Sequence, residues 1–147
     1  MIIWLASYPR SGNTFLRIVI SRLYGHGSST AYPVDGVLER LGGHVVTAEK
    51  ARVSLAEMRD SPDMHFVKTH RRRDYDVCDV DAALYMVRDG RDALVSFARQ
   101  RSEESPERYH DELRALIDRH TGGTASWGHN VLSWLRLRNR LARRRSS

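Results

Sequence analysis

Apolar and polar positions follow one another in blocks that predict three buried strands. The apolar runs are short and rich in strand-forming residues, and they occupy residues 2–6, 65–68 and 83–87. A cluster of polar residues follows each run, at residues 7–14, 68–73 and 88–92. Because each cluster comes where a strand ends, the pattern predicts three strands that each deliver polar side chains to a loop.

The segments between these strands show helical spacing of apolar residues. Thr14 is a good helix-capping residue, and apolar side chains recur behind it from Phe15 to Leu23. Ser54 and Glu57 have the spacing of a capping box, which predicts a short helix over residues 54–59. Further helices are expected after Asp92, over 111–120 and over 126–143, whereas the glycine- and serine-rich residues 25–43 predict a surface excursion.

Strands that alternate with helices predict an α/β fold with a parallel sheet flanked by helices. The length of 147 residues suits one domain, residues 1–147, and the chain contains no internal repeat or long linker. In parallel sheets of this kind, ligands collect at the carboxyl ends of the strands. The three polar clusters are therefore expected to meet at one edge of the sheet and to form the functional site.

The formal charge of +6 is unevenly distributed along the chain. Residues 135–147, an Arg-rich helix end or tail, hold six arginines and no acid: Arg136, Arg138, Arg140, Arg143, Arg144 and Arg145. Without them, 18 of the 24 basic residues remain against 18 acidic ones. A nucleic-acid-binding function would depend on this tail alone, so nucleic acid is a disfavoured partner.

The rest of the composition excludes several classes of protein. The single cysteine, Cys78, permits no internal disulfide and makes a cysteine-based metal site implausible. The histidines have no metal-ligand spacing, so no metal is expected. No apolar run reaches the roughly 18 residues of a membrane span, and the first residues do not form a signal peptide. These features predict a cytoplasmic protein that does not enter a membrane.

The first loop has the chemistry of an anion-binding turn. A strand-loop-helix turn directs backbone N–H groups and the positive end of the helix dipole at a ligand. Gly12 permits close approach, Ser11 and Thr14 offer hydroxyl groups, and Arg10 offers a guanidinium suited to phosphate or sulfate. The same residues also fit an ordinary turn whose polar side chains only cap the helix. The lysine of a Walker A motif is absent, which disfavours a small-molecule kinase.

Residues 8–14 (Tyr-Pro-Arg-Ser-Gly-Asn-Thr) resemble the 5′-phosphosulfate loop of the cytosolic-type sulfotransferases, which use 3′-phosphoadenosine 5′-phosphosulfate (PAPS). Two more motifs follow in the family's order. Residues 68–70 (Lys-Thr-His) resemble the strand end that carries the catalytic histidine, and residues 85–96 resemble the 3′-phosphate segment. Residues 126–134 are similar to a helix of many bacterial members. The resemblance implies a P-loop-like fold and sulfuryl transfer from PAPS to a hydroxyl or amine.

The resemblance also implies a role for each matching residue. His70 would take the proton of the acceptor, and Lys68 and Arg10 would stabilise charge on the transferring group. The residues expected to bind the cofactor are Arg10, Ser11, Gly12, Asn13, Thr14, Phe15, Arg88 and Ser96. Many family members have lysine where this chain has Arg10, and because arginine is a poor proton donor we expect it to stabilise charge only.

Simpler structural interpretations stand beside these roles. Phe15 could stack on adenine or be the first core residue of its helix. Lys68 could be a solvated strand-end lysine, and Arg88 could form only a salt bridge with Asp92. Residues 71–73 are most simply a solvated run of arginines that could also favour an acidic acceptor. The three tryptophans, Trp4, Trp127 and Trp134, are expected in the core.

If the resemblance holds, this chain covers only about half of a typical sulfotransferase domain and is expected to be either a truncated or a minimal domain. An incomplete sheet would expose a strand edge, through which the chain could self-associate. The acceptor, a small molecule or a glycan, is not specified by these motifs. A non-catalytic fragment that binds PAPS or 3′,5′-adenosine bisphosphate (PAP) is the main alternative function, and an Arg-tail nucleic-acid binder is a weaker one.

Overall fold

The structure is a computed structural model that describes residues 1–31, 53–74, 77–119 and 123–135. These residues form two compact units. The first contains the described parts of Met1–Ala6, Gly12–Thr69 and Asp76–Met86, and the second those of Ser7–Ser11, His70–Tyr75 and Val87–Ser147.

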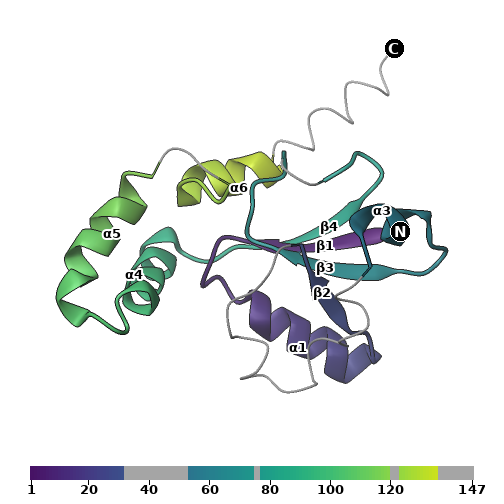
Figure 1. Cartoon of the computed structure of the whole chain (residues 1–147), viewed down its shortest axis with the longest axis horizontal. Helices are drawn as coiled ribbons and strands as arrows, with labels where there is room; N and C mark the ends of the chain where they lie inside the picture. Colours follow the sequence, from purple (N-terminus) through teal and green to yellow (C-terminus); the bar gives the residue numbers. More distant parts are fainter. Residues whose placement is uncertain (32–52, 75–76, 120–122, 136–147) are drawn as a thin grey trace, which may run out of the picture. The chain divides into compact units, whose positions relative to one another are not determined.

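The first unit is built on a four-stranded parallel sheet with strand order β2-β3-β1-β4, which confirms the predicted α/β class (Figure 1). The strands are β1 (Ile2–Ser7), β2 (Ser28–Thr30), β3 (His65–Thr69) and β4 (Ala82–Met86). β1 and β3 pair in parallel with Ile2 opposite His65 and Ala6 opposite Thr69. Because the pairing is in parallel, both strands end at the same edge, as the sequence predicts.

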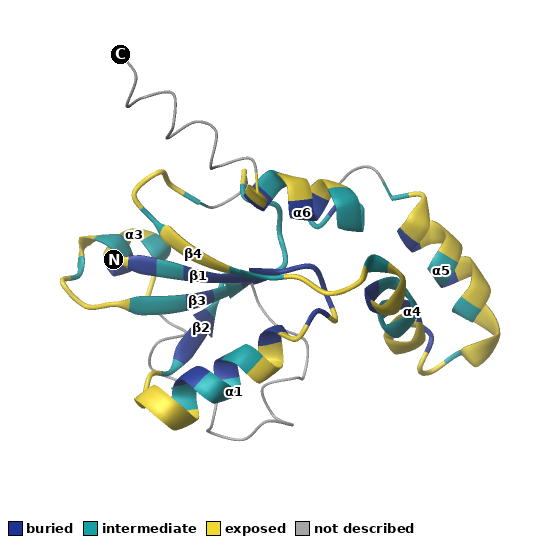
Figure 2. Cartoon of the chain, turned by 180° about the vertical axis from the view of Figure 1, so that it is seen from behind, coloured by how far each residue is buried: buried dark blue, intermediate teal, exposed yellow. Residues whose placement is uncertain are grey.

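The interior strand β1 forms the centre of the core. Trp4, Leu5 and Ala6 are fully buried, and Figure 2 shows β1 as the most buried strand. A strand covered on both faces needs an almost continuous apolar sequence, and residues 2–6 supply one. β4 is the edge strand beside β1, and its first residues, Ala82 to Leu84, are exposed. The predicted exposed strand edge is therefore present in this unit.

Helix α1 (Asn13–Tyr24) follows the first loop, but Thr14 does not cap it. The N-cap is Gly12, whose φ of 96° lies in the left-handed region that glycine adopts without strain. A Cβ at Gly12 would also come within 3.4 Å of the Met86 side chain. Thr14 is instead the second helical residue and is exposed, so the prediction of a threonine cap is wrong.

The predicted surface excursion contains a strand. Ser28–Thr30 forms β2, which pairs in parallel with β3, and Ser28 and Ser29 are buried. Serines have low strand propensity, and tertiary contacts override it here: the Arg17 side chain donates to Ser28 Oγ at 2.8 Å, and Ala31 N–H donates to Lys68 O at 3.1 Å. The remainder of the predicted excursion, from residue 32 on, lies outside the described residues.

Asp81 joins three segments of the first unit. Its carboxylate accepts from Trp4 Nε1 at 2.9 Å, from Arg59 Nη2 at 2.9 Å and from Cys78 N–H at 3.0 Å. Arg59 belongs to α3 (Leu55–Asp60), whose capping box between Ser54 and Glu57 is present as predicted. Burial alone would raise the pKa of Asp81. The hydrogen bonds lower this pKa by more than burial raises it, so it lies below its ordinary value.

The second unit contains α4 (Gly90–Arg101), the 3₁₀ turn η3 (Pro106–Arg108), α5 (Tyr109–Ile117) and α6 (Trp127–Leu135). Helices are therefore confirmed in all three segments predicted after the third strand, and residues 136–143 of the last one lie outside the described residues. Asp89 caps α4 by accepting from Arg91 N–H at 2.9 Å. Gly90 packs against the Trp127 ring so closely that a Cβ would lie 2.8 Å from it.

Two of the three tryptophans are core residues, as predicted. Trp4 is fully buried in the first unit and Trp134 is buried in the second, whereas Trp127 is partly exposed. In the described part of the chain, no helix is long and apolar enough to cross a membrane.

Replacing Asp81 with asparagine is expected to lower the free energy of unfolding by about 2 kcal/mol, because Arg59 loses its carboxylate partner. Since the folded-state pKa of Asp81 is lowered, its contribution is complete above the pKa of an unfolded aspartate and is lost as pH falls through the folded-state value. Urea denaturation of both proteins between pH 7 and pH 3 measures this difference.

The exposed Asp60, at the end of α3, provides the control. Asp60→Asn should change the free energy of unfolding by less than about 0.5 kcal/mol. Equal losses of unfolding free energy in the Asp60 and Asp81 variants at pH 7 would show that the contacts of Asp81 do not stabilise the first unit.

Candidate functional site

The predicted site residues lie in both units. Gly12, Asn13, Thr14, Phe15 and Lys68 belong to the first unit. Arg10, Ser11, His70, Arg88 and Ser96 belong to the second. The two groups are close in sequence: Ser11 and Gly12 are consecutive residues, and His70 is two residues after Lys68.

In the first unit, the beginning of α1 has the features of an anion-binding helix end. Its first turn contains no acidic residue, and no side chain caps it. The Asn13 amide instead donates to Leu5 O at 2.7 Å and ties the helix to the end of β1. The uncapped N–H groups of a helix start carry partial positive charge that favours phosphate or sulfate.

The aromatic ring of Phe15 is 69% exposed at this helix start. The interpretation of Phe15 as a core residue is therefore wrong. An exposed ring in the first turn of α1 remains consistent with the predicted stacking on a base.

Lys68 and Arg17 place two positive charges inside the first unit. The Arg17 side chain is only 3% exposed and donates to Ser28 Oγ at 2.8 Å, and Lys68 is half-buried at the end of β3. Burial, and secondarily the nearby charge of Arg17, lower the pKa of Lys68 to about 8. Because Lys68 is half-buried, it is not a fully solvated strand-end lysine.

In the second unit, the loop before Gly12 is tightly turned. Ser11 N–H donates to Tyr8 O at 3.3 Å, and Arg10 has a φ of 65°, in the left-handed region that non-glycine residues seldom adopt. Ser11 is 4% exposed, and its Oγ has no hydrogen-bond partner among the described residues. A buried hydroxyl group of this kind costs free energy unless a ligand satisfies it.

The His70 ring is oriented by the last residue of β1. Nδ1 lies 2.9 Å from Ser7 O and 3.2 Å from Ser7 Oγ. A carbonyl oxygen only accepts hydrogen bonds, so this network assigns the proton of the neutral ring to Nδ1. Nε2 is then the basic nitrogen, which is the protonation state that a general base requires.

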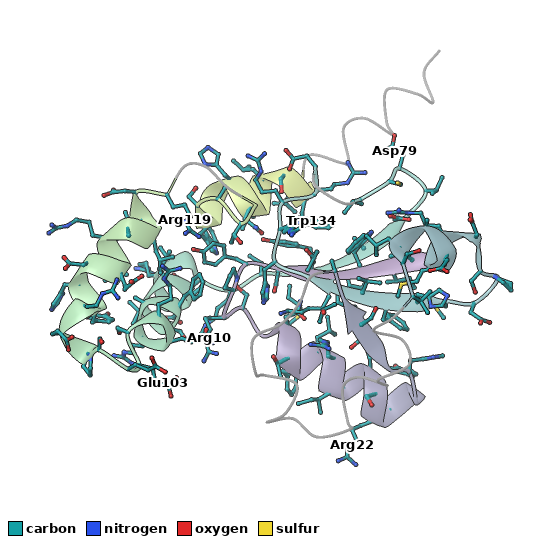
Figure 3. All side chains as sticks on the ribbon, viewed as in Figure 1. Arg10, Arg22, Asp79, Glu103, Arg119 and Trp134 are labelled. Atoms are coloured by element: carbon teal, nitrogen blue, oxygen red, sulfur yellow. The ribbon has the colours of Figure 1, made fainter. Side chains whose placement is uncertain are left out.

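Arg10, Arg88 and Ser96 form one cluster beside α4. Arg10 is labelled in Figure 3. Its Nε donates to Ser96 Oγ at 3.0 Å, and Arg88 Nη1 donates to Arg10 O at 3.2 Å. Arg88 Nη2 also lies 3.7 Å from Asp92, so the predicted salt bridge exists alongside this contact. Both arginines are exposed, and their charges are therefore accessible to an anion in solution.

Residues 71–73 are not a fully solvated run of arginines. All three are half-buried, and Arg72 pairs with Asp74. The Arg71 side chain lies beside Gly123. Helix α6 contacts the backbone of Arg71 and Arg73, and Arg72 N–H donates to Gly123 O, which explains why these residues do not extend freely into water.

Sequence reasoning missed Arg17, Ser7 and Asn130. Arg17 is an arginine on the buried face of an amphipathic helix, which is a detectable signal because such a residue needs a specific partner. Ser7 acts through its carbonyl oxygen, which any residue supplies, so no sequence signal marks it. Asn130, whose amide donates to His70 O at 2.9 Å, lies in a motif that the sequence singles out, but its partner depends on the fold.

The two groups of residues supply complementary chemistry. The first unit offers an uncapped helix start and two cations, the buried Arg17 and the half-buried Lys68, which suit an anion. The second offers an oriented imidazole base and an exposed pair of arginines. Among the described residues, no group of three His, Cys, Asp or Glu side chains could hold a metal ion.

Comparisons with known proteins agree with this chemistry. A family model described as the sulfotransferase domain matches residues 2–142, which is nearly the whole chain. No curated protein matches the chain significantly. Because the family model covers all three motifs and the elements that carry them, the chain belongs to the sulfotransferase family.

Proposed function

We propose that this chain transfers a sulfuryl group from PAPS to a hydroxyl or amine group of a small molecule or glycan. The observation that carries the proposal is the orientation of His70, whose Nδ1–H donates to Ser7 O at 2.9 Å and leaves Nε2 as the base. Family membership supports the sulfotransferase class, and the donor, the acceptor and the roles of individual residues are our inference.

In the proposed reaction, the bond between the sulfur and the phosphate oxygen of the donor breaks while the sulfur binds the acceptor oxygen or nitrogen. The proton of the acceptor moves to His70 Nε2, and the electron pair of the broken bond stays on the phosphate of PAP. Charge on the transferring group changes during this step, so fixed positive groups lower the barrier. By analogy with phosphoryl transfer, positioning and charge stabilisation would provide most of the catalysis.

Lys68, Arg10 and Arg88 would provide the fixed charge. Lys68, with its pKa lowered to about 8, is charged at neutral pH and is also able to give up a proton. Arg10 retains its charge throughout and would stabilise the leaving oxygen without protonating it. Arg88, with Ser96 one or two helical turns later, would bind the 3′-phosphate.

Features of both units support PAPS as the donor. The buried Ser11 hydroxyl lacks a partner among the residues that the structure describes, Gly12 presents no side chain, and the first turn of α1 presents no acid that would repel an anion. The exposed ring of Phe15 fits a purine stacking surface. PAPS would supply the activated sulfuryl group, and these residues would hold its phosphates and base.

A reducing, cytoplasmic location is part of the proposal. It is supported by the single cysteine, Cys78, which is exposed and has no second cysteine with which to pair.

Replacing His70 with alanine is expected to lower kcat for sulfuryl transfer by about 10²–10⁴-fold, because the acceptor loses its base. The affinity for PAP should stay unchanged, since His70 is not expected to hold the cofactor. Transfer of labelled sulfate from PAPS to a panel of phenols, sugars and amines measures the rate. His110→Ala, at an exposed position of α5, is the matched control and should keep full activity. Wild-type activity in the His70 variant would remove this residue from the mechanism.

Binding of PAP is expected to weaken as the pH rises through about 8, where the Lys68 ammonium loses its charge. The stability of the free protein should change in the opposite direction. Because the folded-state pKa of Lys68 is lower than the unfolded value of 10.5, the unfolded chain holds the proton over this range and stability rises with pH. Calorimetric titration with PAP and thermal unfolding from pH 6.5 to 9.5 measure the two effects.

Lys68→Arg is the control for this titration, because arginine keeps its charge over the whole range. Its affinity for PAP should show a flatter dependence on pH. Identical pH profiles for the wild type and Lys68→Arg would contradict a titrating lysine at the binding site.

Replacing Arg88 with alanine is expected to weaken PAP binding by about 10- to 100-fold, as one charge-assisted contact to the 3′-phosphate is lost. Arg91→Ala removes a neighbouring, more exposed arginine of the same segment and should leave the affinity within about threefold of wild type. Calorimetry with PAP measures both variants. Equal losses would indicate that Arg88 acts only through general positive charge.

A further inference from the structure

Helix α6 contacts the chain at His70 itself. The Asn130 side chain is 0% exposed, and its amide nitrogen donates to His70 O at 2.9 Å and to Thr124 O at 3.0 Å. Each contact uses one of the two N–H groups of the amide. A single buried side chain thus joins the histidine backbone to the segment that precedes α6, and all of these residues belong to the second unit.

The same helix also contacts the backbone of Arg71 and Arg73, in the segment that follows His70. Trp134 Nε1 donates to Arg71 O at 3.1 Å (Figure 3), and Ser133 Oγ accepts from Arg73 N–H at 3.2 Å. Positions 130, 133 and 134 have i, i+3, i+4 spacing and therefore share one helix face. One face of α6 consequently holds the backbone at residues 70, 71 and 73.

These backbone contacts have a consequence for the imidazole. The ring of His70 is joined to its backbone through two rotatable bonds, so the 2.9 Å contact between Nδ1 and Ser7 O is maintained only while the His70 backbone is fixed. Loss of that contact removes an acceptor that stabilises the Nδ1–H tautomer, so the tautomer in which Nε2 carries the proton becomes more populated. In that tautomer Nε2 is a donor and does not act as a base.

We propose that Asn130 is a positioning residue that fixes the His70 backbone so that Nδ1–H donates to Ser7 O and Nε2 stays basic. Trp134 and Ser133 support the same segment. The importance of a basic Nε2 for catalysis rests on the proposed sulfuryl transfer, whereas the effect of Asn130 on the tautomer does not.

The test is long-range ¹H–¹⁵N NMR of the histidine rings in the full chain at a pH where the imidazoles are neutral, with His70→Gln used to assign the His70 signals. In the wild type we expect the Nδ1–H tautomer of His70. In Asn130→Ala the ratio of Nδ1–H to Nε2–H should fall about tenfold, which corresponds to the loss of one hydrogen bond. Trp134→Phe, which removes the indole N–H that donates to Arg71 O, should lower the ratio by about threefold.

Ser126→Ala is the matched control. Ser126 Oγ accepts from His129 N–H at 3.3 Å at the beginning of α6, so its loss weakens the helix without removing a contact to residues 70–73. The tautomer ratio of His70 should stay as in the wild type. An unchanged ratio in Asn130→Ala, or an equal change in Ser126→Ala, would overturn the positioning role. Where circular dichroism shows that Asn130→Ala does not fold, an unchanged ratio in Trp134→Phe overturns it.

Kinetics separate this proposal from the proposed function. With PAPS and a working acceptor, Asn130→Ala should lower kcat by about 10- to 100-fold at an unchanged KM for PAPS, and the pH–rate profile should change shape. If the tautomer ratio changes in Asn130→Ala but the wild type transfers no sulfate, the proposed function is contradicted and the positioning role is supported. Transfer by the wild type with no tautomer change would contradict the positioning role alone.

Discussion

The hydrogen bond from His70 Nδ1 to Ser7 O, at 2.9 Å, is the contact on which the proposed chemistry depends. It exists because β1 and β3 run in parallel with Ala6 opposite Thr69, so that the next residue of each strand, Ser7 and His70, leaves the sheet at the same level. A shift of the strand register would separate the ring from its acceptor and turn the side chains of a strand to the other face. The buried, apolar sequence of β1 opposes that shift, because a shift would move its apolar side chains out of the core.

Electrostatics in the first unit favour an anionic ligand. Two cations, Lys68 and Arg17, are held in a partly buried environment, and the lowered pKa of Lys68 records the cost of burying its charge there. A bound anion would relieve this cost, because it would satisfy both charges at once. The uncapped beginning of α1 adds partial positive charge without a further side chain. These features support the proposal that the first unit binds part of an anionic donor, since functional sites often hold groups with shifted pKa values.

The strand pattern and the ordered motifs were enough to predict the α/β class, three of the four strands and the family. They were insufficient where tertiary contacts decide local structure. β2 consists of two serines and a threonine whose pairing depends on Arg17 and β3, and α1 begins at a glycine in the left-handed region rather than at Thr14. The roles of Ser7 O and the Asn130 amide could not be predicted from the sequence. Every residue type supplies a backbone acceptor, and the hydrogen-bond partner of a side-chain amide depends on the fold. The roles of the motif residues, and their meeting in one site, remain predictions.

The central claim is that this chain itself carries out sulfuryl transfer. It is tested most directly by incubating the purified wild-type protein with PAPS and a panel of hydroxyl and amine acceptors, and following both PAP and the acceptors by mass spectrometry. The account predicts that PAP forms in amounts equal to an acceptor that gains one SO₃ group. PAP at the level of a protein-free control with every acceptor, from a protein that binds PAP, would contradict catalysis and leave a nucleotide-binding protein.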